Sequence, residues 1–85
     1  MNWELVIVSR APKSIKRFPK EDRRRIVQAL QELRTDPFSG DVVKLEDAGN
    51  VWRRRVGAYR IFYEMIVQEK TIYVFRIERR NSKTY

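Results

Sequence analysis

Residues 51–67 have the sequence VWRRRVGAYRIFYEMIV, and this stretch decides the fold. It contains two runs rich in aromatic and β-branched residues, which are typical of strands, and Gly57 lies at the break between them. Side chains alternate between the two faces of a strand, so Arg54 lies on one face of the first run, and Arg53 and Arg55 lie on the other. The stretch therefore predicts two successive strands with a cationic side.

The second run and the residues after it extend this pattern into a sheet. Residues 68–70 turn the chain into residues 71–77, the most β-prone segment, and the polar tail from 78 to 85 is expected to be irregular. Consecutive strands joined by short turns form an antiparallel meander, and its apolar face needs a helical layer. The apolar face of the second run comprises Tyr59, Ile61, Tyr63 and Met65.

The N-terminal half begins with a strand and a short helix. Residues 3–8 are rich in valine and isoleucine and predict a strand. Residues 11–18 predict a short amphipathic helix that Pro19 ends, and residues 42–46 predict another strand.

A stronger helix is predicted over residues 20–36. Ile26, Leu30 and Leu33 follow one another at helical spacing, so they share one face of this helix. The two helices form a hairpin that covers the meander. Residues 1–85 are thus expected to form a single α+β domain, with an N-terminal strand, an α-helical hairpin and then an antiparallel β-meander.

The positive charge is concentrated near the C-terminal end. Lysine and arginine number 19 against 11 acidic residues, a net charge of +8, and histidine and cysteine are absent. Residues 1–50 carry ten basic and eight acidic side chains (net +2), whereas residues 51–85 carry nine and three (net +6). Arginine suits phosphate contacts and base stacking, so this pattern favours a nucleic acid partner over a charge that only confers solubility. No apolar run is long enough for a signal peptide or a membrane span, so a cytoplasmic protein without disulfides is expected.

The chemistry available to this sequence is limited. Without histidine, cysteine, a Gly-rich phosphate loop or a Ser-His pair, neither a transition-metal site nor a cofactor is expected. RNA cleavage needs no metal when the 2′-hydroxyl attacks the adjacent phosphate, provided that the protein positions the groups and stabilises the growing negative charge. Four cations from adjacent strands and the start of the tail are candidates for this role: Arg53, Arg55, Arg60 and Arg79.

The stretch VWRRRVGAYRIFYEM resembles the hallmark of the RelE/ParE superfamily, in which a basic strand is followed by glycine and then by Tyr-Arg on the next strand. Residues 42–52, VVKLEDAGNVW, resemble the segment before this motif, and Arg79 and Tyr85 resemble the closing residues of the RelE branch. The resemblance covers essentially the whole chain. It implies the toxin of a type II toxin–antitoxin system. Such a toxin would be a metal-independent endoribonuclease that cleaves messenger RNA in the ribosomal A site by 2′-hydroxyl attack and is inhibited by a cognate antitoxin protein.

The resemblance also assigns roles to individual residues. Arg53 and Arg55 match two basic residues of the family that grip RNA phosphates. Arg60 is the arginine of the Tyr-Arg motif, and Arg79 matches the arginine after the last strand; both are implied to stabilise the phosphate being cut. Tyr85, six residues after Arg79, matches a tyrosine that contacts and orients the nucleotide.

One departure from the family concerns the general base. The best-known bacterial members carry lysines where this chain has Arg53 and Arg55, and an arginine cannot be deprotonated in a protein. The remaining proton acceptors nearby are Tyr85, Lys83 and Glu78. A phenol near fixed cations should have a pKa below its usual value of about 10. Tyr85 is therefore the first candidate for the general base.

Other functions stay open. A ParE-like toxin has the same fold and inhibits DNA gyrase without catalysis, but that branch typically lacks the closing Arg79 and Tyr85 that this chain keeps. A basic RNA-binding module would bind RNA in a salt-dependent way without cutting it. A toxin that has lost its activity would retain only the scaffold.

Alternation along the strands predicts the places of several other side chains. Arg54 and Arg76 fall on the face opposite Arg53 and are expected to be structural or to contact a partner. Phe62 and Tyr63 are expected in the core rather than on a platform for stacking bases.

Overall fold

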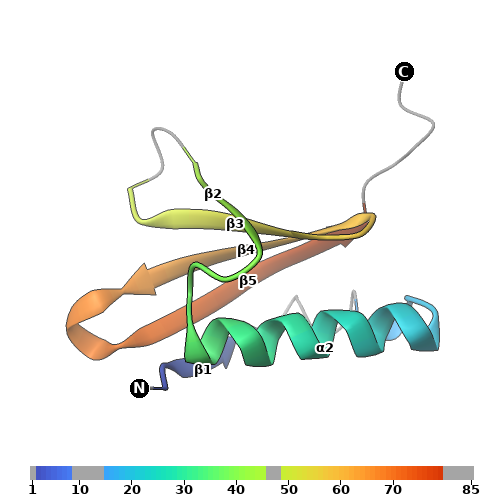
Figure 1. Ribbon diagram of the computed structural model, residues 1–85, viewed down its shortest axis with the longest axis horizontal. Helices are drawn as coiled ribbons and strands as arrows, with labels where there is room; N and C mark the ends of the chain where they lie inside the picture. The colour runs from blue at the N-terminus through green and yellow to red at the C-terminus, as the bar shows by residue number, and fades with distance from the viewer. Residues whose placement is uncertain (1, 9–14, 46–48, 80–85) are drawn as a thin grey trace.

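The computed structural model describes residues 2–8, 15–45 and 49–79, which form one sheet and one helical layer (Figure 1). The elements, in chain order, are strand β1 (Glu4–Ile7), helix α2 (Lys20–Thr35), strands β2 (Asp41–Lys44), β3 (Val51–Val56) and β4 (Tyr59–Ile66), 3-10 helix η1 (Val67–Glu69) and strand β5 (Thr71–Arg79). The predicted α+β architecture is confirmed. Residues 15 and 16, from the predicted helix 11–18, are helical, and the first part of that prediction lies outside the described residues.

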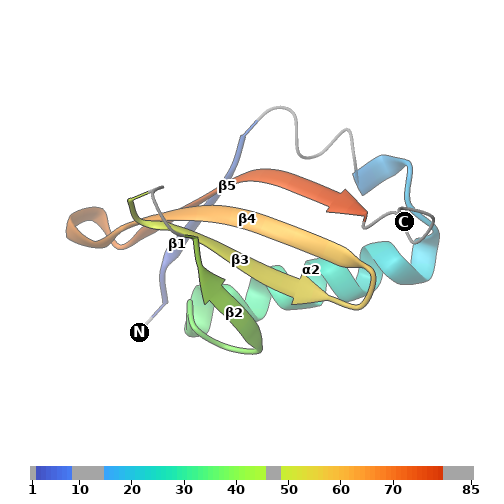
Figure 2. The same ribbon diagram turned by 90° about the horizontal axis from the view of Figure 1, so that it is seen from above.

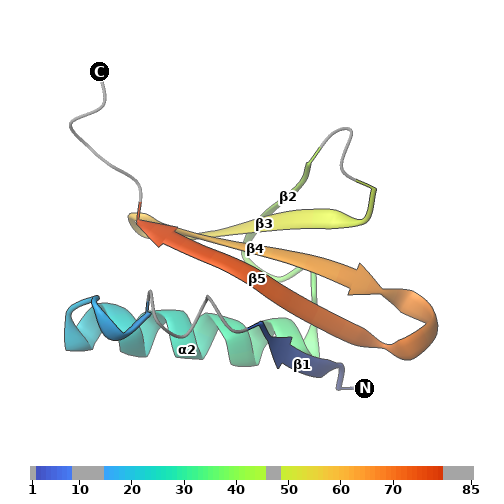
Figure 3. The same cartoon turned by 180° about the vertical axis from the view of Figure 1, so that it is seen from behind.

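All five strands belong to one sheet, in the order β1-β5-β4-β3-β2 (Figure 2). Strands β2 to β5 form the expected antiparallel meander. Strand β1 pairs parallel with β5, with Glu4 opposite Thr71, and so forms one edge of the sheet. Strand β2 forms the other edge, and helix α2, which lies between β1 and β2 in the chain, is below the sheet (Figure 3).

Helix α2 packs its apolar stripe against one face of the sheet. Ile26, Leu30 and Leu33 are at most 4% exposed, which confirms the predicted helix face. Glu21 and Asp22 lie in the first turn and Arg34 in the last, where acidic and basic groups interact favourably with the helix dipole. The buried strand residues that complete this core are Tyr59, Ile61, Tyr63, Met65, Ile72, Val74 and Ile77.

The pairing of β4 with β5 contains a β-bulge. Phe62 lies opposite Arg76, whereas its neighbour Tyr63 lies opposite Val74, so Phe75 is an additional residue on β5. An additional residue shifts the alternation of side chains by one position in the rest of the strand. The two parts of β5 on either side of Phe75 therefore follow opposite alternation patterns.

The bulge determines which β5 side chains face the helix. Before it Val74 is buried against α2, and after it Ile77 is buried on the same side. Arg76 and Glu78 consequently face away from the helix. The prediction that Arg76 and Arg53 lie on different faces of the sheet is therefore wrong, because simple alternation does not hold across the bulge. The strand also continues to Arg79, two residues beyond its predicted end, since its last residues still pair with the start of β4.

Candidate active site

Four arginines gather on the outer face, the side of the sheet turned away from α2. We call this group the arginine face: Arg53 and Arg55 on β3, Arg60 on β4 and Arg76 on β5. Arg55 lies directly opposite Arg60 in the β3–β4 pairing. Like charges placed directly opposite each other destabilise a sheet, so this arrangement needs compensating anions.

Asp41 supplies the first compensating carboxylate. It lies opposite Arg55 in the β2–β3 pairing. Its two oxygens are 4.0 Å from Nη2 of Arg53 and 4.0 Å from Nε of Arg55, and the Asp41 side chain is 55% exposed. Long and exposed ion pairs contribute little to stability. Asp41 therefore leaves both guanidinium groups able to bind another anion.

Glu78 supplies the second carboxylate and holds it between two arginines. One oxygen is 2.7 Å from Nη2 of Arg60 and the other is 2.7 Å from Nη2 of Arg76. These are short charge-assisted contacts. Among the residues that the structure describes, only Asp41 and Glu78 form ion pairs with these four arginines, so the arginine face keeps a surplus of positive charge, which favours a polyanion such as RNA.

Arg79 does not lie with this group. It is opposite Tyr59 in the β4–β5 pairing, so it lies on the helix side of the sheet. Its guanidinium carbon is 5.9 Å from the centroid of the Tyr59 ring, and its side chain is exposed at the end of β5. The structure thus brings Arg53, Arg55 and Arg60 together but places the Arg79 guanidinium on the other face. Tyr85 lies outside the described residues, and its role stays a prediction.

The described tyrosines are poor proton acceptors near neutral pH. Burial and a 2.6 Å hydrogen bond that the Tyr59 hydroxyl donates to Asp22 raise the pKa of Tyr59, although Arg79 opposes the shift. Burial raises the pKa of Tyr63 to about 12, and the negative charge of Glu69 raises the pKa of Tyr73. None of these three phenols is available as a phenolate at neutral pH.

Aromatic rings extend the outer face beside the arginines. Phe62 is only half-buried there, with the Arg76 guanidinium 5.5 Å from its ring centroid and Phe75 6.4 Å away. The prediction that Phe62 belongs to the core is therefore wrong, since Phe62 shares the outward orientation of Arg60. The same prediction for Tyr63 is confirmed, because its ring is fully buried and its hydroxyl donates a 2.6 Å hydrogen bond to the carbonyl oxygen of Pro37.

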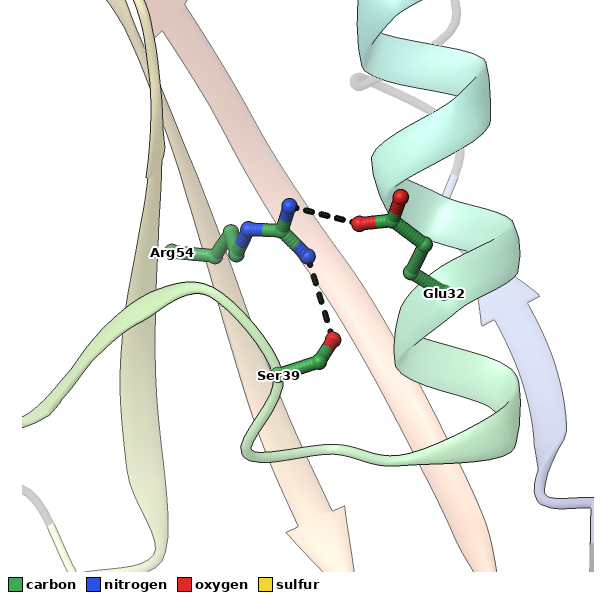
Figure 4. A network of polar contacts seen from close by, with 3 residues as sticks. All are labelled: Glu32, Ser39 and Arg54. Carbon is green, nitrogen blue, oxygen red and sulfur yellow. Dashed lines mark hydrogen bonds and ion pairs between the residues drawn. The ribbon is translucent and has the colours of Figure 1, made fainter.

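Arg54 lies on the helix side, as alternation predicts, and anchors the strand that carries its two neighbours. Its side chain is 11% exposed and contacts Glu32 of α2 through Nη2 at 2.8 Å (Figure 4). Nη1 donates a weaker hydrogen bond, 3.3 Å long, to Ser39. Gly40 has a φ of +78°, and a Cβ at this position would lie 2.5 Å from Nε of Arg54. The alternation identified the orientation of Arg54, but nothing in the sequence identified these partners.

The described ranges contain no group of three or more His, Cys, Asp or Glu residues placed to hold a metal ion. No helix within them is both long enough and apolar enough to cross a membrane.

Comparisons with known proteins agree with this architecture. The chain is similar to the RelE of an archaeal RelE–RelB complex from Pyrococcus horikoshii OT3, with 28% identity, a TM-score of 0.84 and coverage of 96% of this chain and 99% of that one. It is 25% identical over 83 residues to a Methanocaldococcus jannaschii protein that carries the name toxin RelE1, covering 94% of this chain and 92% of that protein. The isolated E. coli RelE toxin shares the fold, with a TM-score of 0.82, 18% identity and coverage of 96% and 88%.

A family comparison covers most of the chain. Residues 8–83 match the family described as ParE toxin of type II toxin-antitoxin system, parDE. The fold is shared with RelE structures, and the order of elements along the chain, a strand, a helix and then antiparallel strands, agrees with the resemblance noted from the sequence. The chain belongs to the RelE/ParE superfamily of toxins from type II toxin–antitoxin systems and is RelE-like in its fold.

Proposed function

We propose that this toxin is a metal-independent endoribonuclease that cleaves messenger RNA in the ribosomal A site. The observation that carries the proposal is the arginine face, whose four arginines form ion pairs with only two carboxylates among the described residues. Preorganised cations of this kind stabilise the charge that develops on a phosphate when the 2′-hydroxyl attacks it. The site of action would be the cytoplasm, where the ribosome and its messenger RNA are found.

Each arginine has a distinct part in this proposal. Arg60, next to the turn between β3 and β4, contacts the phosphate being cut, and Arg53 and Arg55 bind the flanking phosphates. Arg79 is exposed at the end of β5, and its long side chain joins the site only when RNA is bound. Tyr85 orients the nucleotide at the cut. Positioning by these groups converts the attack into an intramolecular step.

The first test compares Arg60→Ala with the wild type on ribosomes programmed with a short messenger RNA. Loss of a contact used mainly in the transition state should lower the single-turnover rate by about 10²–10³. Arg34→Ala is the matched control, because it removes an exposed arginine from the last turn of α2 and leaves the outer face intact. Cleavage at the wild-type rate by the Arg60→Ala, Tyr85→Ala double variant would show that this site is wrong.

An antitoxin protein is the expected partner. Similar toxins have been crystallised as RelE–RelB complexes, including the Pyrococcus horikoshii pair. A surface groove of about 750 Å³ runs along α2, and Val27, 45% exposed, lies in it. An amphipathic acidic segment would cover both the apolar and the basic parts of this groove. Its lining residues are Ile15, Lys20, Arg23, Arg24, Val27, Gln28 and Gln31.

Expression of the chain alone should therefore arrest growth, and co-expression of its antitoxin should restore it. Healthy cells with abundant wild-type protein and no partner would contradict the proposal. A Val27→Asp variant should weaken antitoxin binding and leave messenger cleavage unchanged, because Val27 is exposed in the groove along α2 and the arginine face is on the other side of the sheet.

Inhibition of DNA gyrase is the second candidate function. The observation in its favour is that the matching family is described as ParE toxin, parDE. A purified gyrase supercoiling assay separates the two candidates. An endoribonuclease should leave supercoiling unaffected at concentrations that cleave ribosome-bound messenger, and a ParE-like toxin should do the reverse.

A further inference from the structure

The proposed cleavage needs a group that accepts the 2′-hydroxyl proton. The arginines of the arginine face cannot do so, because a guanidinium does not release its proton in a protein. The three described tyrosines are also excluded as phenolates, since each has a raised pKa. Among the described side chains of the outer face, a carboxylate is the remaining kind of acceptor.

Of the described carboxylates on this face, Glu4 lies on the edge strand β1 beside Thr71, at the end of β5 remote from Glu78, and the other three differ in their distance from Arg60. Glu64 is four residues away along β4, which corresponds to roughly 13 Å of extended strand. Asp41 is on the edge strand β2 and is paired with Arg53 and Arg55 only at 4.0 Å. Glu78 alone of the three makes a 2.7 Å contact with Arg60.

We propose that Glu78 is the general base of this reaction. The inference rests on the proposed function, and its basis is the position of the carboxylate between Arg60 and Arg76. A phosphate that binds Arg60 must lie beside the Glu78 carboxylate, because Arg60 contacts both. The 2′-hydroxyl adjoining that phosphate is then within reach of a carboxylate oxygen, as general-base catalysis requires.

The bulge in β5 is the second observation. If Phe75 paired regularly with Phe62 instead of bulging, Glu78 would lie opposite Tyr59 and face α2, and Arg79 would face outward. Bulges occur preferentially beside active sites, where they redirect a side chain. Here the redirected side chain is the carboxylate, and it lies directly opposite Arg60.

The chemical step conserves atoms and charge. Glu78 takes the proton of the 2′-hydroxyl as the 2′-oxygen forms a bond to phosphorus. The bond between phosphorus and the 5′-oxygen breaks, and its electron pair goes to the 5′-oxygen, which takes a proton from water. The products are a 2′,3′-cyclic phosphate and a 5′-hydroxyl, and Glu78 returns its proton to the solvent.

The charged surroundings of Glu78 come from three strands. Arg60 on β4 and Arg76 on β5 contact the carboxylate directly. Arg55 on β3 lies opposite Arg60, and its counterion Asp41 lies on β2. The arginines keep a fixed charge, and Asp41 lies beyond Arg55. If substitution of Glu78 changes the acid limb of the pH–rate profile, that change can therefore be attributed to the base itself.

The test compares Glu78→Gln, Glu78→Asp and the control Glu64→Gln with the wild type. Glu64 is an exposed carboxylate on the same face of the sheet, in strand β4. Its variant therefore removes one negative charge without touching Arg60. The substrate is a short messenger RNA in programmed ribosomes, and a matched messenger with a 2′-deoxy nucleotide at the mapped cut site measures binding without cleavage. Each full-length variant is assayed by single-turnover cleavage across a range of pH.

We expect Glu78→Gln to lower the cleavage rate by about 10²–10⁴, the usual contribution of a general base. Binding of the 2′-deoxy messenger should be unchanged or tighter, the loss of rate that we expect for the wild type at acid pH should disappear, and Glu78→Asp should retain part of the activity. Glu64→Gln should behave as the wild type does.

Two results would overturn the assignment. One is a Glu78→Gln rate within about threefold of the wild type. The other is an equal loss of cleavage and binding, which would indicate that Glu78 only positions the arginines. If the wild type does not cut the messenger at all, the proposed function itself is wrong, and the role of Glu78 fails with it.

Discussion

Replacing Glu32 by alanine tests how the sheet is fixed to the helix. Glu32 is 45% exposed, but its partner Arg54 is only 11% exposed, so the ion pair is buried on one side only. The variant leaves the Arg54 guanidinium beneath the sheet with one remaining hydrogen bond, of 3.3 Å, to Ser39. Arg54 cannot escape this cost by losing its proton.

The size of the effect follows from the burial of the two groups. Breaking a fully buried ion pair by removal of one partner costs about 3–5 kcal/mol, whereas exposed pairs contribute about 0.2–1 kcal/mol. Because Glu32 is half exposed, the cost of Glu32→Ala should lie between these limits, at about 2 kcal/mol of unfolding free energy. For a domain of this size the expected fall in Tm is about 8–16 °C.

Urea denaturation followed by circular dichroism measures the loss, with Gln31→Ala as the matched control. Gln31 is an exposed neighbour on α2, and its replacement should change stability by less than about 0.5 kcal/mol. Arg54→Met removes the buried charge and fills the same space, so combining it with Glu32→Ala should recover most of the loss. A cost below about 0.5 kcal/mol for Glu32→Ala would refute the reasoning, because the pair would then behave as an exposed one.

Three further predictions concern the core, the buried tyrosine and the tail. Leu30→Ala should lower the free energy of unfolding by about 2–5 kcal/mol in urea titrations, because Leu30 is 4% exposed and its loss leaves a cavity; a change below about 1 kcal/mol would contradict this packing. The pKa of Tyr63 is about 12 in the folded state, against 10.0 for a free tyrosine. The unfolded chain therefore releases this proton first, and stability should fall between pH 10 and pH 12 by up to about 1.4 kcal/mol per pH unit. Tyr63→Phe should flatten that slope, and an unchanged slope would exclude Tyr63 as its cause. Tyr85→Phe should cleave messenger nearly as fast as the wild type and Tyr85→Ala much more slowly; a large loss in Tyr85→Phe would instead make the phenol the proton acceptor.

The fold was largely predictable because period and spacing are local properties of a sequence. The helical spacing of Ile26, Leu30 and Leu33 and the alternation around Tyr63 were sufficient to identify the core faces. The parallel pairing of β1 with β5 was not predictable in this way, since residues 3–8 indicate a strand but contain nothing that selects its neighbour. That choice depends on how the whole sheet closes over α2.

The site was predictable in part. Arg53, Arg55 and Arg60 share a face because β3 and β4 are regular and joined by a tight turn. The places of Arg76 and Arg79 were not predictable, because the apolar side chains of β5 follow one alternation pattern before Phe75 and the other after it. A bulge in such a strand becomes visible only when its pairing with β4 is known.

The additional residue in β5 has a consequence for how relatives of this chain diverge. Deletion of Phe75 would remove the bulge but leave Tyr63 opposite Val74 and Phe62 opposite Arg76, so Glu78 and Arg79 would keep their faces. If the bulge closed with Phe75 retained, Phe75 would instead pair with Phe62, and Glu78 and Arg79 would exchange faces without a substitution at either position. The outer face would then lose the carboxylate opposite Arg60. A one-residue gap in the last strand of a relative therefore need not move any side chain to the other face, whereas loss of the bulge without a gap does so.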